Sequence, residues 1–253
     1  MDRRTLLLAA GAAALSGCGG PDPGPAAAPA PGPSGRGSAS GPAPSAAGRP
    51  SPKALPAEVG SGPRDVPAVA LTFHGQGEPG VVGGLLDALA AEHVKVTVLA
   101  VGAWVHQQPA LARRVLADGH ELGNHTLNHA DIKAMSDDRA YAEISGCAEA
   151  LREVSGSIGR WFRPSQTQHS TPRIQAQAER AGYATCLSYD VDSLDYTDPG
   201  ADKVVRATLD NVRNGSIVSL HFGHAGTVTA IPKLLAGLRE RGLRPVTATE
   251  LLA

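Results

Sequence analysis

The feature that most constrains the fold is an alternation, from residue 65 to residue 253, of short β-branched runs with amphipathic helical stretches. Five times a helical stretch ends at a glycine and a strand-like run follows. This pattern predicts successive βα units and a mainly parallel sheet, because parallel strands need a long crossover connection. So many units in one domain favour a closed or nearly closed (β/α) barrel over an open sheet. The expected strands are 66–73, 94–101, 121–124, 159–163, 183–189, 217–222 and 245–247.

The helices have readable boundaries. Residues 137–154 carry an apolar stripe at helical spacing, and Ser136 is placed to cap them. Pro109, Pro172 and Pro232 occupy expected first-turn positions, where the missing N–H costs nothing. The glycines expected just past helix ends are Gly119, Gly156, Gly182, Gly215 and Gly242.

Polar clusters follow five of the expected strands. In barrels of parallel strands the chemistry collects at the carboxyl ends of the strands, so these clusters predict one shared site. They contain His74, His125 with His129, Arg163, Asp192 with Asp195, and His221 with His224.

The histidine pair His125 and His129 is the best candidate for a metal site. The two lie four positions apart in G-N-H-T-L-N-H, so one helical turn or a tight loop places both imidazoles within reach of one ion. A hydrogen-bonding pair without metal is the alternative.

The first 18 residues read as an export signal. Arg3 and Arg4 precede the apolar run 6–15, which is too short to span a bilayer. The run ends in L-S-G-C at Cys18, which resembles the lipobox of bacterial lipoproteins, with cleavage at an ordinary signal site as the alternative. The general and the twin-arginine export routes both stay open.

Residues 19–64 are rich in Pro, Ala, Gly and Ser and predict a disordered linker, because they cannot bury enough apolar surface to offset the entropy of ordering. The folded domain is expected at 65–253. A formal net charge of −1 gives no basic excess, so nucleic acid is not an expected partner.

Four motifs together resemble the polysaccharide deacetylases with a NodB homology domain, carbohydrate esterase family 4. The resemblance spans residues 65–253 and implies a distorted (β/α) barrel that removes acetyl groups from N-acetylated sugars with the help of a metal. The motifs are H-T-L-N-H at 125–129, F-R-P at 162–164, D-S-L-D-Y at 192–196 and L-H at 220–221.

The resemblance also implies roles for individual residues. His125 and His129 would bind a divalent metal, with zinc the first choice. His221 would be the general acid, held by Asp195, and Arg163 would orient the general base.

The first motif departs from the family pattern T-F-D-D-G, whose first Asp is the base and whose second completes the metal triad. Here His74 and Gly75 occupy those positions. His74 is therefore either the base or the third metal ligand, and the base role is slightly favoured because Gly75 leaves the ligand position empty. Ser165 and Gln166 also replace the family's residues after Pro164, which puts the wall that faces the sugar in question.

The sequence thus predicts an exported, lipid-anchored, monomeric barrel enzyme that deacetylates a cell-envelope glycan. A catalytically silent glycan-binding module on the same fold is the alternative. The glycan, the choice between N- and O-acetyl groups, and the metal stay open. Cys147 and Cys186 are expected to be buried free thiols, although an exported protein permits a disulfide.

Overall fold

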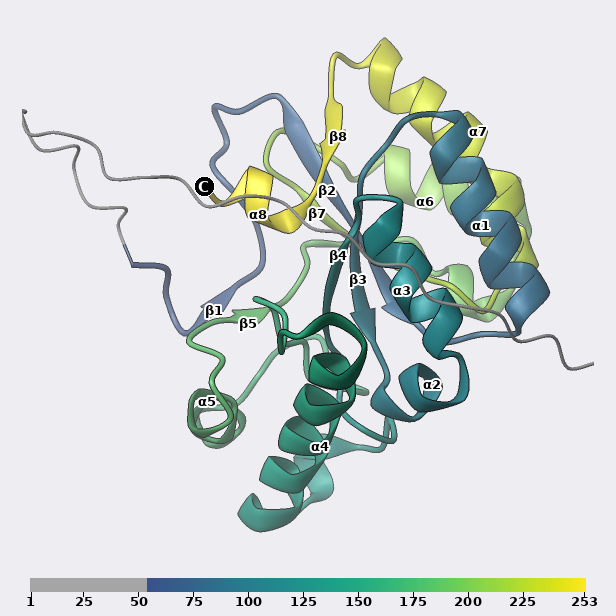
Figure 1. The fold of residues 1–253 in the computed structure, drawn as a ribbon. Helices are drawn as coiled ribbons and strands as arrows, with labels where there is room; N and C mark the ends of the chain where they lie inside the picture. Colours follow the sequence, from purple (N-terminus) through teal and green to yellow (C-terminus); the bar gives the residue numbers. More distant parts are fainter. Residues whose placement is uncertain (1–53) are drawn as a thin grey trace, which may run out of the picture. The chain divides into compact units, whose positions relative to one another are not determined.

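The computed structural model describes residues 54–253 (Figure 1). The predicted signal peptide, Cys18 and linker residues 19–53 lie outside the described residues. The strands are β1 (Glu58–Val59), β2 (Ala68–Gly75), β3 (Thr97–Ala100), β4 (Glu121–Asn124), β5 (Cys186–Leu187), β6 (Val191–Asp192), β7 (Ile217–His221) and β8 (Arg244–Val246). The helices are α1 (Pro79–Ala91), α2 (Gly102–Gln107), α3 (Pro109–Ala117), α4 (Asp137–Ser155), α5 (Pro172–Arg180), α6 (Ala201–Leu209), α7 (Ala225–Glu240) and α8 (Ala248–Leu251), with single 3₁₀ turns η1 (Ile132–Ala134) and η2 (Asp195–Thr197).

The strands form a distorted parallel barrel, as predicted. The main sheet has the order β4-β3-β2-β7-β6, β8 also pairs with β2, and β1 pairs with β5. Bridges from Phe162 to Asn124 and to Cys186 continue the pairing from β4 to β5. Every pairing between named strands is parallel, and helices such as α1 and α7 pack outside β2 (Figure 1).

The strands differ from the prediction most at 159–163 and 183–189, and the expected strand at 94–101 shortens to β3 at 97–100. The expected strand at 159–163 forms only the Phe162 bridges, because Gly159 adopts a left-handed φ of 75° and Pro164 follows closely. The expected strand at 183–189 shortens to β5, and the next pairing segment, β6, was not predicted. Its two residues are too few to show alternation in the sequence.

The predicted end of the linker at residue 64 is too late. β1 lies within it and pairs with β5, and the Arg64 guanidinium contacts the Asp190 carboxylate at 2.8 Å. A two-residue strand has no periodicity to read, so composition alone misplaced the boundary.

The helix predictions differ from the structure at three residues: Ser136 precedes α4 but makes no side-chain cap hydrogen bond, Gly215 lies well past the end of α6 at Leu209, and Pro232 is not in a first turn. α4 begins after Ser136 and ends at Gly156 in a left-handed conformation. Pro109 and Pro172 begin α3 and α5, but Pro232 lies inside α7, not in its first turn. α7 begins earlier, at Ala225, and its buried face already starts at Thr227 in the first turn.

Strand alternation decides which β2 side chains reach the barrel interior. Leu71 and Phe73 are fully buried in the core shared with the helices, whereas Thr72 and His74 point the other way. In register, Thr72 pairs with Ser219 and His74 with His221, so these side chains share the interior face. Cys147 and Cys186 are buried free thiols, as predicted. Between residues 54 and 253 no helix combines the length and the apolar character needed to cross a membrane.

Candidate active site

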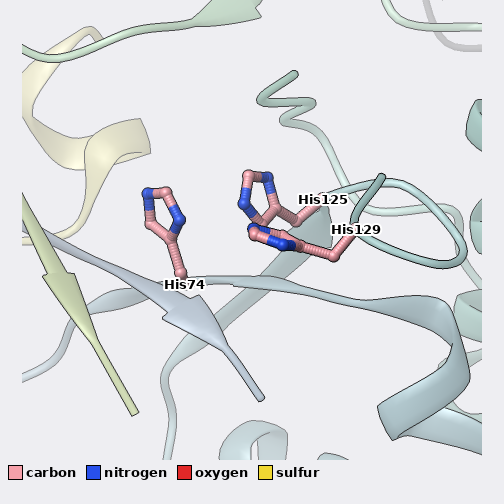
Figure 2. Close-up of side chains that lie close together, drawn as sticks. All are labelled: His74, His125 and His129. Atoms are coloured by element: carbon pink, nitrogen blue, oxygen red, sulfur yellow. The ribbon is translucent and has the colours of Figure 1, made fainter. Parts of the chain in front are cut away.

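Three histidines from two strand ends converge in space. His74 is near the end of β2, and His125 and His129 follow β4. One ligand nitrogen from each ring lies within 4.8 Å of the others. Figure 2 shows the rings of His125 and His129 close together, with the ring of His74 facing them. His74, whose role the sequence left open, therefore lies beside the two predicted metal ligands.

His125 is oriented by the backbone of Arg163. Its Nδ1–H donates to the Arg163 carbonyl oxygen at 2.9 Å, which leaves Nε2 as the free acceptor. Within residues 54–253 this buried Nε2 has no hydrogen-bond partner. Burial above all, and then the neighbouring His129, hold the pKa of His125 well below its ordinary value, so the ring is neutral.

The loop that carries His129 is fixed by α4. The Leu127 and Asn128 amides donate to the backbone oxygen and carboxylate of Glu143, at 2.9 and 2.8 Å. Thr126 and His129 both adopt left-handed φ angles, of 67° and 54°. Such angles are unusual for residues with a Cβ and persist only where surrounding contacts enforce them, so the direction of His129 is imposed by the fold.

His74 presents one nitrogen to the same space. Its Nε2 contacts the Ser219 hydroxyl at 3.1 Å, while its buried Nδ1 has no partner among the residues that the structure describes. Burial, followed by the charges of His125 and His221, lowers the pKa of His74 well below its ordinary value. A neutral imidazole with an unused lone pair is suited to metal binding, whereas so low a pKa weakens a general base.

These residues fit a divalent metal of the zinc class. An unpartnered buried polar atom is costly, and here two such nitrogens, on His74 and His125, lie beside a third histidine. Three imidazoles with an open position are a known donor set for catalytic zinc.

Gly75 cannot easily hold the carboxylate of the family pattern. A Cβ at this position would lie 2.7 Å from Val98 Cγ1 and 3.0 Å from the Ala100 Cα. The second of these atoms is backbone in the paired strand β3, so a larger residue requires the sheet to shift. The packing therefore argues against restoring the carboxylate here, and His74 is the available source of a third ligand.

His221 and Asp195 form the predicted pair. The His221 Nδ1 lies 2.7 Å from one Asp195 oxygen, and the His221 amide donates to the other at 2.8 Å. The Thr227 hydroxyl donates to that same oxygen at 2.6 Å. Burial alone would raise the pKa of Asp195, but the hydrogen bonds from His221 and Thr227 outweigh it and hold the pKa below its ordinary value. The ring of His221 lies 4.2 Å, centroid to centroid, from that of His74.

Arg163 is buried without a salt bridge to any described carboxylate. Its guanidinium donates to the Leu187 carbonyl and the Thr72 hydroxyl, both at 2.9 Å, and burial lowers its pKa to about 10. The expected contact with a base at position 74 is absent from the hydrogen bonds of the described chain. Arg163 acts on the site through its carbonyl, which orients His125.

Two hollows adjoin at His74 and His221. One, of about 490 Å³, extends toward α2, and the other, of about 400 Å³, extends toward Tyr196, whose exposed fraction is 48%. A hollow on each side of the histidines suits an elongated ligand. Sequence reasoning missed Ser219 and Thr227, and only the alternation that places Ser219 on the same face as His221 could have indicated the former.

The fold and this site define a class, the distorted (β/α) barrels that gather histidines at the carboxyl ends of their strands. Comparison with known proteins narrows the class. The family profile described as polysaccharide deacetylase matches residues 61–186. The peptidoglycan-N-acetylglucosamine deacetylase of Bacillus cereus is 32% identical over 75% of this chain and 90% of its own. A chitooligosaccharide deacetylase of Bradyrhizobium is 31% identical over 69% of this chain and 86% of its own.

A solved structure agrees with the sequence relatives. The crystal structure of a peptidoglycan N-acetylglucosamine deacetylase superposes with a TM-score of 0.72 at 26% identity, covering 77% of this chain and 92% of that one. The chain belongs to the polysaccharide deacetylase family. The predicted family, fold class and enzyme class are confirmed.

Proposed function

We propose that this protein is a metal-dependent deacetylase of an N-acetylated cell-envelope glycan, with His74, His125 and His129 as the metal ligands and zinc as the expected ion. The observation that carries the proposal is the convergence of three ligand nitrogens, two of them buried without a partner in residues 54–253. The relatives named for peptidoglycan and chitooligosaccharide support the glycan substrate.

A bound divalent metal supplies Lewis acidity to the acetyl carbonyl and acidifies water. The chain supplies proton transfer. Because Asp195 occupies the Nδ1 side of His221, the Nε2 of that ring is left for the substrate. With His74 among the ligands, His221 serves both transfers: its Nε2 accepts a proton as water attacks the carbonyl carbon, and it returns that proton to the nitrogen as the C–N bond breaks.

Acetate release tests this function. The purified domain, incubated with N-acetylated chitooligosaccharides and peptidoglycan fragments, is expected to release acetate, and a chelator is expected to stop the release until zinc is restored. The matched control is the double variant His125→Ala, His129→Ala, which should be inactive with or without added zinc. Glycan binding with no chelator-sensitive acetate from any substrate would instead favour the silent glycan-binding module, which the missing carboxylates at His74 and Gly75 suggest.

We propose that the protein is exported and anchored through lipid on Cys18, and this rests on the sequence alone. Residues 19–53 are rich in Pro, Ala, Gly and Ser, a composition typical of a spacer, which suits a tether between a membrane and its glycan. Mass spectrometry of the mature protein is expected to find diacylglycerol on Cys18, and Cys18→Ala should release the protein into the medium. An unmodified N-terminus at another residue contradicts the anchor.

A further inference from the structure

A second His–Asp pair lies beside the first. The Nδ1 of His224 is 2.8 Å from an Asp198 oxygen, and each member stands three residues after its counterpart in the pair His221–Asp195. The two pairs differ in their surroundings. The Asp195 side chain is fully buried, whereas 69% of the Asp198 side chain and 25% of the His224 side chain are exposed.

His224 lines the larger hollow together with His74 and His221. Its ring lies 5.9 Å from that of His221, centroid to centroid, with an interplanar angle of 83°. The Nδ1–H of His224 donates to Asp198. The Nε2 of His224 is therefore a free acceptor, and it has no hydrogen-bond partner in the described part of the chain. An oriented imidazole nitrogen is thus available next to the reacting position.

The pair is not needed to fasten η2 to α7. Asp195 already connects η2 to α7 through the Thr227 hydroxyl, and to β7 through the His221 amide. His224 precedes α7 without capping it, since its side chain accepts no bond from the helix amides described here. The η2 turn is nonetheless bounded by two left-handed residues, Leu194 at φ 57° and Asp198 at φ 51°. Leucine is costly in this conformation, and backbone strain of this kind gathers at functional sites.

The rest of this hollow has the chemistry of a neutral sugar site. The amide side chains of Gln76, Gln107 and Asn128 line it, and they can both donate to and accept from hydroxyl groups. The one carboxylate in its lining, Glu78, disfavours an anionic ligand. An imidazole held through Nδ1 adds one more directed hydrogen bond.

We propose that His224, positioned by Asp198, is a substrate-binding residue that hydrogen-bonds a neutral hexosamine residue adjacent to the sugar that is deacetylated. The inference deepens the proposed function, on which it rests for the place of the reacting sugar beside His74 and His221. It assigns the larger hollow to the neighbouring sugar of the same glycan chain.

The test compares ligand lengths. Titration calorimetry with the N-acetylglucosamine tetramer is expected to show a Kd about 3- to 10-fold higher for His224→Ala than for wild type, the range expected for one hydrogen bond. Binding of the monosaccharide, followed by ligand-observed NMR, should not change, because one sugar does not fill both positions. In steady-state assays with the tetramer, His224→Ala should raise KM and leave kcat unchanged. The hydrogen bond is made equally in the bound substrate and in the transition state, so its loss weakens both.

Two further variants separate a local contact from a general disturbance. His224→Gln keeps a hydrogen-bonding side chain and should recover part of the affinity, and Asp198→Asn should lose affinity for the tetramer alone. The matched control is His106→Ala, which should bind both ligands as wild type does. His106 is exposed, pairs with Glu153 at 3.6 Å and lines neither hollow.

The inference is overturned if His224→Ala binds the tetramer as wild type does, or if it loses monosaccharide and tetramer equally. It is also overturned if the tetramer does not bind wild type, or if His224→Ala loses only glycan fragments that carry a carboxylate. A length-dependent loss in a protein whose wild type releases no acetate would keep His224 as a glycan-binding residue but refute the deacetylase function, and with it the place of a reacting sugar beside His74 and His221.

Discussion

The variant His74→Ala is expected to lose its metal. Elemental analysis of the purified protein should give about one equivalent of zinc for wild type and almost none for the variant, with zinc affinity reduced by at least about 100-fold. The physical reason is the donor count. Without the Nδ1 of His74, only the nitrogens of His125 and His129 remain within 4.8 Å of each other, and two imidazoles do not complete the site.

The control is a histidine whose ring lies close to that of His74 but which is not a proposed metal ligand. The His221 ring lies 4.2 Å from the His74 ring, centroid to centroid, yet His221→Ala should keep its zinc. Ser219→Ala should weaken zinc binding by about 10-fold, because Ser219 fixes the other nitrogen of His74. Equal zinc in wild type and His74→Ala, combined with lost activity, contradicts the ligand role and restores the base role that the sequence slightly favoured.

The sequence predicted His125 as a metal ligand but left the role of His74 open, and this difference has a physical cause. His125 and His129 lie four positions apart, so the sequence alone indicated that both rings could reach one ion, although the direction of His129 is set by contacts with α4. The role of His74 depends on how β2 stands against β3 and β7, which no local pattern contains. The close approach that a Cβ at position 75 would make to the backbone of Ala100 is equally a property of the assembled sheet.

The same division holds for the fold. Long apolar runs such as β2 and the striped helix α4 were readable because many residues contribute to one period. The two-residue strands β1 and β6 were not, because their pairing partners define them. The pair His224–Asp198 was missed for a related reason, since its members lie 26 residues apart and meet only when η2 packs against β7.

Proton transfer by His221 is the second large effect. His221→Ala is expected to lower kcat by about 10²- to 10⁴-fold while zinc content stays unchanged. Asp195→Asn should cost a large part of the same factor, because an amide can hold the ring in the wrong tautomer and does not stabilise a charged imidazole. Acetate release by zinc-loaded variants, measured at saturating glycan, gives kcat directly.

The control for this effect leaves both catalytic groups in place. Thr227→Val removes one of the hydrogen bonds that lower the pKa of Asp195, while the two bonds from His221 remain. Its effect on kcat should therefore be much smaller, about 10-fold or less. If Asp195→Asn keeps the wild-type kcat, the carboxylate only fastens η2 to α7. If Thr227→Val lowers kcat as much as Asp195→Asn does, the role of Asp195 is again to fasten η2 to α7. A large loss of kcat in His221→Ala and Asp195→Asn alone assigns proton transfer to this pair.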